Sequence, residues 1–254
     1  MSVILDRPLV IFGVSLVVQW LAAYIGDLLR RRRRAPPSAV EREDFSTIQT
    51  PTLTLLALIV GFSFSMAVSR YDQCKNLEEA EANAIGTEYV RADLLPSADA
   101  ARVRDLLTKY LDQRIVFYES HDERLLGQAD AETAKLQAEL WSAVLPLAKS
   151  QPTPVAALTV SGMNDVLNSQ GYTQAAWWNR IPVSAWTLMI FIAAASNIVL
   201  GYGQHRTSYV LLVITPLVVS IAFFLIADVD SPRLGVIRVP PQNLMALADS
   251  IKPH

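Results

Sequence analysis

Apolar residues gather in four long stretches, at about 9–29, 51–69, 184–201 and 208–227. A helix needs ~20 apolar residues to cross a hydrocarbon core of ~30 Å, and each stretch approaches that length. The pattern therefore predicts four transmembrane helices in two pairs. The first stretch is longer than the ~7–15 apolar residues of a signal peptide, so we expect it to be retained.

Charged and polar residues fill the long segment between the two pairs. Strong helix formers follow the second apolar stretch until Pro96, which predicts one continuous helix from about 51 to 95. No segment shows sustained strand alternation, so the predicted fold is all-α. The predicted divisions are a first transmembrane pair (1–69), a helical extramembrane domain (70–182), a second transmembrane pair (183–227) and a C-terminal tail (228–254).

A run of five arginines follows the first apolar stretch: Arg30, Arg31, Arg32, Arg33 and Arg34. Basic residues in short loops mark the cytoplasmic side of a membrane protein. We therefore expect the 27–50 loop to be cytoplasmic, with the 70–182 domain outside. The same arginines could bind anionic lipid headgroups, at ~1 kcal/mol for each basic residue near the surface.

Chemistry-bearing motifs are scarce. The net charge of -2 gives no sign of a nucleic-acid partner, and one cysteine with three dispersed histidines predicts neither a metal site nor a cofactor. There is no Gly-rich phosphate loop and no nucleophile elbow, so we predict that the protein is not an enzyme. The carboxylates of Glu78, Glu79, Glu81 and Glu88 are interpreted as a solvated helix face.

Small residues recur at every fourth position of the second apolar stretch. Gly61, Ser65 and Ser69 lie on one helix face, and Asp72 extends it. Such a stripe favours close helix packing. Repeated around a symmetric oligomer, it could instead line a narrow polar pore, with Phe62 beside it as an apolar constriction. The pattern alone leaves both interpretations open.

A second group of candidate residues would lie at one membrane face, where the second and fourth helices exit and the third enters. Its members are Arg70, Asp72, Arg180, Asp228, Asp230 and Arg233. Opposite charges at a low-dielectric boundary are expected to pair. The group could lock the helix ends together or form an ion vestibule.

Three runs, 61–96 (beginning GFSFSMAVSRYDQ), 160–182 and 228–242, resemble a bestrophin-like group of bacterial membrane proteins. This group is distantly related to the bestrophin anion channels. The resemblance implies a ring-shaped homo-oligomer with the second helix lining a pore. It also implies a cytoplasmic helical domain, opposite to the orientation that the arginines predict.

The predicted function is an oligomeric channel for small ions, with anions as the candidate class. Its predicted partners are the lipid bilayer, further copies of the chain and small inorganic ions. The alternative is a non-conducting scaffold or sensor whose helical domain binds a partner.

Overall fold

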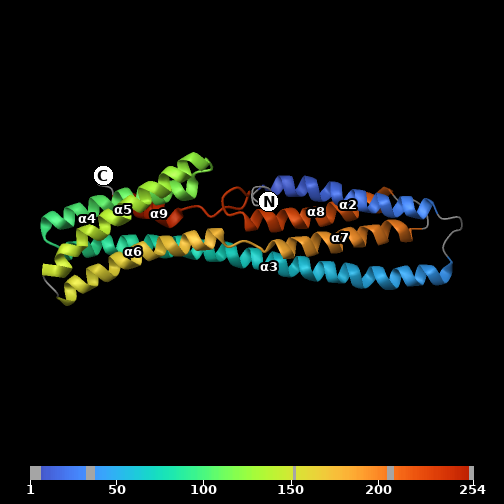
Figure 1. Ribbon diagram of the computed structural model, residues 1–254, viewed down its shortest axis with the longest axis horizontal. Helices are drawn as coiled ribbons and strands as arrows, with labels where there is room; N and C mark the ends of the chain where they lie inside the picture. Colours follow the sequence, from blue (N-terminus) through green and yellow to red (C-terminus); the bar gives the residue numbers. More distant parts are fainter. Residues whose placement is uncertain (1–6, 33–37, 151–152, 205–208, 252–254) are drawn as a thin grey trace. The chain divides into compact units, whose positions relative to one another are not determined.

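The computed structural model describes residues 7–32, 38–150, 153–204 and 209–251, and within them it contains helices and no strand. The all-α prediction is confirmed. The chain divides into two compact units (Figure 1). The first comprises Met1–Arg70 and Arg180–Arg238, and the second comprises Tyr71–Asn179 and Val239–His254.

The first unit is built from apolar helices. They are α2 (Pro8–Arg31), the N-terminal part of α3 (Ala39–Arg91), α7 (Val183–Gly203) and α8 (Tyr209–Asp230). Prolines stand at or just before the first turns of α2 and α7, where a missing N–H leaves no hydrogen bond unmade. α2 packs along both α7 and α8. Four helical stretches of the described chain are long and apolar enough to cross a membrane, as the sequence predicted.

α3 is longer than predicted. It begins at Ala39 and contains Pro51, so most of the expected 27–50 loop is helical. Pro51 removes one backbone hydrogen bond, and it is tolerated because it and the preceding turn are largely exposed. At the other end α3 reaches Arg91, and a short 3₁₀ turn, η1 (Ala92–Leu94), precedes Pro96. The predicted continuous helix is therefore present.

The second unit is a helical bundle around the C-terminal part of α3. Its other helices are α4 (Ser97–Glu119), α5 (Glu123–Ser150), α6 (Pro154–Trp178) and α9 (Gln242–Ile251). The apolar positions of α4 recur every three or four residues, and Val103, Leu107 and Leu111 among them are fully buried. They meet Leu140 of α5 and Met163 of α6 in one core.

Helix α9 was not predicted from the tail sequence. Its apolar residues Leu244 and Ala248 are buried, one turn apart. The carboxylate of Glu78 on α3 accepts hydrogen bonds at 2.9 Å from the backbone N–H groups of Asn243 and Leu244, and at 2.6 Å from the Asn243 side chain. An acceptor there satisfies donors that a helix N-terminus leaves open. Glu78 thus fixes α9 to the side of α3.

Candidate functional site

The small-residue stripe of α3 is uncovered in the chain. Gly61, Ser65 and Ser69 are exposed, and Phe62 is 63% exposed. Only 17% of the apolar stretch of α3 is buried, whereas 50% of the apolar stretch of α8 is buried. A Cβ added at Gly61 would meet no atom within 4 Å. The stripe therefore makes no packed seam within its own unit. Asp72, which extends the stripe, is also exposed.

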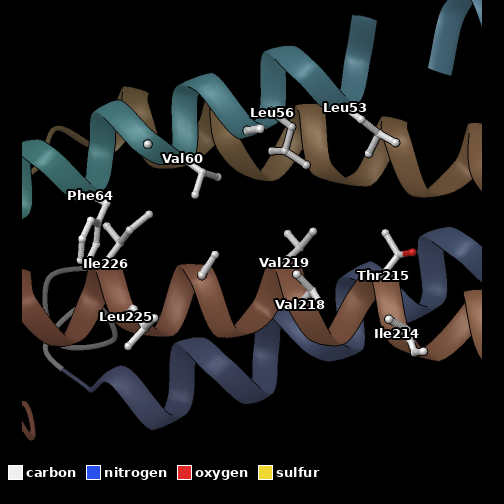
Figure 2. Close-up of a pocket in the computed structure, with 13 residues that line it drawn as sticks. Leu53, Leu56, Val60, Phe64, Ile214, Thr215, Val218, Val219, Leu225 and Ile226 are labelled. Atoms are coloured by element: carbon white, nitrogen blue, oxygen red, sulfur yellow. The ribbon is translucent and has the colours of Figure 1, made fainter. Parts of the chain in front are cut away.

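An apolar groove with a volume of about 590 Å³ lies between α3 and α8 (Figure 2), and its lining on α3 includes Gly61. Leu56, Val60 and Phe64 of α3 face Val219 and Ile226 of α8 across it. The lining is almost wholly hydrocarbon, and such a space does not hold ordered water. The groove therefore provides no path for a hydrated ion. Of the stripe residues, Gly61 lines this groove, whereas Ser65 and Ser69 are not among its lining residues.

The structure brings together part of the predicted charge cluster. Arg70 of α3 forms an ion pair with Asp230 at the end of α8, and both side chains are largely buried. Arg180, which precedes α7, donates a hydrogen bond to the Ser231 hydroxyl at 3.2 Å. These contacts tie the ends of the helices in the first unit to one another.

Asp228 has a different role from the one predicted. Its carboxylate accepts the backbone N–H groups of Val236 at 2.6 Å and Ile237 at 3.0 Å. The carboxylate therefore organises the turn after α8, and both of these hydrogen bonds come from the backbone and neither from an arginine. Arg233 lies in the same turn and is half-buried. Asp72 belongs to the second unit.

The arginine run is partly held by a residue that sequence analysis did not single out. Asp27 is buried, and its carboxylate forms ion pairs with Arg30 at 2.7 Å and Arg31 at 2.8 Å. Both arginines lie at the C-terminus of α2, where positive charge is favoured by the helix dipole. Arg32 is exposed, and Arg33 and Arg34 lie outside the described residues.

Close helix packing occurs between α2 and α7, where sequence analysis did not place it. Gly26 lies directly against the backbone of Ile198, and Gly201 lies against the backbone of Ala23. One turn away, Asn197 donates a hydrogen bond to Gln19 at 2.7 Å, and both side chains are fully buried. Small residues and interhelical hydrogen bonds hold helices together in lipid. The spacing Ala193, Asn197, Gly201 was the available signal in the sequence.

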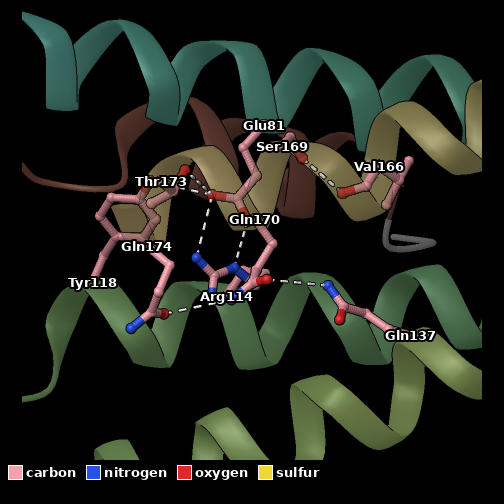
Figure 3. A network of polar contacts seen from close by, with 9 residues as sticks. All are labelled: Glu81, Arg114, Tyr118, Gln137, Val166, Ser169, Gln170, Thr173 and Gln174. Carbon is pink, nitrogen blue, oxygen red and sulfur yellow. Dashed lines mark hydrogen bonds and ion pairs between the residues drawn. The ribbon is translucent and has the colours of Figure 1, made fainter. Parts of the chain in front are cut away.

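The interpretation of the α3 carboxylates as a solvated face is wrong for three of the four. Glu78, Glu81 and Glu88 are buried, and only Glu79 is exposed. Glu81 accepts hydrogen bonds from the Arg114 guanidinium, and from the Tyr118 and Thr173 hydroxyls at 3.2 Å each (Figure 3). The helices α4 and α6 that supply these donors could not be placed beside α3 from the sequence.

The Glu81 cluster also perturbs its partners. Burial opposes the charge on Arg114, but the adjacent Glu81 carboxylate raises the pKa of Arg114 above its usual value. Burial, together with the same carboxylate, raises the pKa of Tyr118. Both residues therefore keep their protons at neutral pH, and the cluster is a structural ion pair.

Solved structures with the same fold include bacterial bestrophin homologues. A bacterial bestrophin homologue from Klebsiella pneumoniae, solved by zinc SAD phasing, has a TM-score of 0.63 and 16% identity, with coverage of 94% of each chain. A tryptophan-to-alanine variant of that homologue has a TM-score of 0.67 and 13% identity, covering 94% of this chain and 97% of its own. No curated protein sequence shows significant similarity. A model of the bestrophin-like domain matches residues 11–244, and the chain, an integral membrane protein, therefore belongs to the bestrophin-like family.

Proposed function

We propose that the protein is an oligomeric membrane channel for small ions, with the apolar part of α3 lining the pore. The observation that carries this proposal is the exposure of Gly61, Ser65 and Ser69 on the least covered of the membrane helices. By contrast, the small residues of α2 and α7 lie on helix faces that pack against each other within the chain. A polar stripe that no helix of its own unit covers is suited to water around a symmetry axis.

Family membership supports the same proposal, since the group is related to the bestrophin anion channels. Phe62 lies next to the stripe and is exposed, as an apolar constriction would require. The stripe carries hydroxyls and no fixed charge before Asp72. Small inorganic ions, with anions as the candidate class, are the proposed substrates, and further copies of the chain are the proposed partners.

A single reporter thiol tests the pore. Ser65→Cys is made with Cys74→Ala, because Cys74 is buried and a hydroxyl there would be desolvated. In a pore, a small charged thiol reagent should reach position 65 and change ion flux into liposomes, since exposed thiolates react. The matched control is Ser63→Cys in the same background, because Ser63 is 4% exposed on the covered face of the same helix.

The expected result is labelling and altered flux at position 65, with neither at position 63. If position 65 is protected until the protein is denatured, and no small ion crosses above empty liposomes, α3 is a seam between copies. The protein would then be a scaffold or sensor that acts through its helical domain.

We also propose an orientation, with the arginines in the cytoplasm of a bacterial inner membrane and the 70–182 segment as an extracytoplasmic domain. The support is the charge asymmetry of the loops. Arg32 is exposed and available to anionic headgroups, whereas Arg30 and Arg31 also bind Asp27.

Reporter fusions test this orientation directly. A reporter that is active only in the cytoplasm should work when fused after residue 40. It should fail when fused after His121, which lies in the turn between α4 and α5. The opposite pattern would show that the helical domain is cytoplasmic, as the family resemblance implies. A reporter that needs export, placed at the same two positions, is the control.

A further inference from the structure

Glu88 is the one carboxylate on the buried face of α3 for which the described residues supply no hydrogen-bond donor. Its side chain is fully buried, and neither carboxylate oxygen accepts a hydrogen bond. The nearest cation, Arg91 Nη1, is 3.9 Å away and belongs to a side chain that is 28% exposed. Glu78 and Glu81 on the same helix each accept several hydrogen bonds.

A glycine of α6 makes room for this carboxyl. Glu88 and Arg91 both reach over Gly162, where an added Cβ would collide with Glu88 Oε2 and Arg91 Nη1. The Glu88 carboxyl is therefore held between α3 and the bare backbone of α6. Two other charged groups act on it, Arg91 on its own helix and Asp165 on α6. In the described residues no set of three metal-ligating side chains forms.

A buried carboxylate without donors is costly, whereas the neutral acid in the same place is much less so. Burial raises the pKa of Glu88 from 4.5 to about 8. The positive charge of Arg91 lowers this pKa, and the negative charge of Asp165 raises it. Glu88 lies in the second unit, beyond the apolar stretch 51–69.

We propose that the Glu88 carboxyl is a proton-binding site at the contact between α3 and α6. It holds a proton while α3 packs on Gly162, and it loses that proton in alkaline solution, where the carboxylate must gain water or the Arg91 guanidinium. The released proton goes to bulk solvent, so no other reactant is needed. This goes beyond ion conduction, because proton binding is a property of the folded bundle whether or not the protein is a channel.

Linkage gives the sign of the effect on stability. The unfolded chain loses this proton near the ordinary glutamate pKa of 4.5, and the folded chain keeps it up to about pH 8. Between these values the folded state binds more protons than the unfolded state, so stability falls as pH rises. Below the lower value the carboxyl is protonated in both states and contributes no pH dependence.

The test uses the full-length, detergent-purified protein and three variants. Glu88→Gln keeps the shape but cannot titrate, so its melting temperature should rise relative to the wild type as the pH increases from 5 to 9. Infrared spectra should show a protonated carboxyl band that disappears with a midpoint near pH 8 in the wild type. This band should be missing in Glu88→Gln.

Two surface substitutions should move the infrared midpoint in opposite directions. Asp165→Asn removes a negative charge and should lower the midpoint, and Arg91→Gln removes a positive charge and should raise it. If Glu88 had a purely structural role and did not titrate, neither substitution would change the midpoint. The proposal is overturned if no carboxyl band depends on Glu88 at neutral pH. A difference in melting temperature between Glu88→Gln and the wild type that is constant across the pH range would overturn it equally.

Discussion

Replacing Arg114 by methionine should destabilise the helical bundle by ~3–5 kcal/mol, because it leaves a buried carboxylate without its counter-charge. Arg114 and Glu81 are both fully buried, and the guanidinium also lies over the Phe117 ring at 4.4 Å. Methionine fills much of the same volume, so the cost comes from the stranded charge and less from a cavity. Thermal or denaturant unfolding of the purified protein measures this loss.

The double variant Glu81→Leu/Arg114→Met should recover much of the stability, since an apolar pair avoids the desolvation of both charges. The Tyr118 and Thr173 hydroxyls would then lose their acceptor, so we do not expect full recovery. Lys109→Met is the matched control on the same helix. Its partner Asp105 and Lys109 itself are each 60% exposed, and such pairs contribute ~0.3–0.5 kcal/mol. Equal losses for Arg114→Met and Lys109→Met would show that the buried pair has been misassigned.

The substitution Gly26→Ala should destabilise the membrane helices by ~1–3 kcal/mol, although alanine is the better helix former. A Cβ at this position would collide with the backbone carbonyl of Ile198 and lie 3.0 Å from the backbone nitrogen of Tyr202. Backbone atoms cannot rotate aside as a flexible side chain can, so α2 and α7 must separate. Separation would also weaken the buried hydrogen bond between Asn197 and Gln19.

Gly13→Ala on the same helix is the control, because a Cβ there meets no atom within 4 Å. That variant should be neutral or slightly more stable, so the two alanine substitutions should have opposite signs. Unfolding in detergent with increasing denaturant compares them. If both variants gain stability, α2 and α7 do not approach as closely as Gly26 requires.

Most of the membrane architecture could be predicted from the sequence because it depends on the solvent. A run of ~20 apolar residues must lie in hydrocarbon or in a core whatever its neighbours are, so all four membrane helices were predicted. The bounds of α2, α7 and α8 were correct within a few residues, whereas α3 begins earlier than predicted, at Ala39. The apolar residues Val103, Leu107 and Leu111 recur every four residues in the sequence, and they form the buried face of α4. Both features depend only on the order of residues within a single helix, so they can be predicted from the sequence.

Contacts between helices were decided by the tertiary structure. Glu79 and Glu81 are similar in sequence context, yet one is exposed and the other is bound to Arg114 and Thr173, which lie 33 and 92 residues away in sequence. The Gly61 stripe has the same four-residue spacing as Ala193, Asn197 and Gly201 of α7. Within the described residues of the first unit, the α7 row packs closely on another helix and the Gly61 stripe does not. Burial and pairing depend on which helix arrives at a face. The sequence determined which faces are apolar, and the packing of α4, α6 and α7 determined which polar groups became buried.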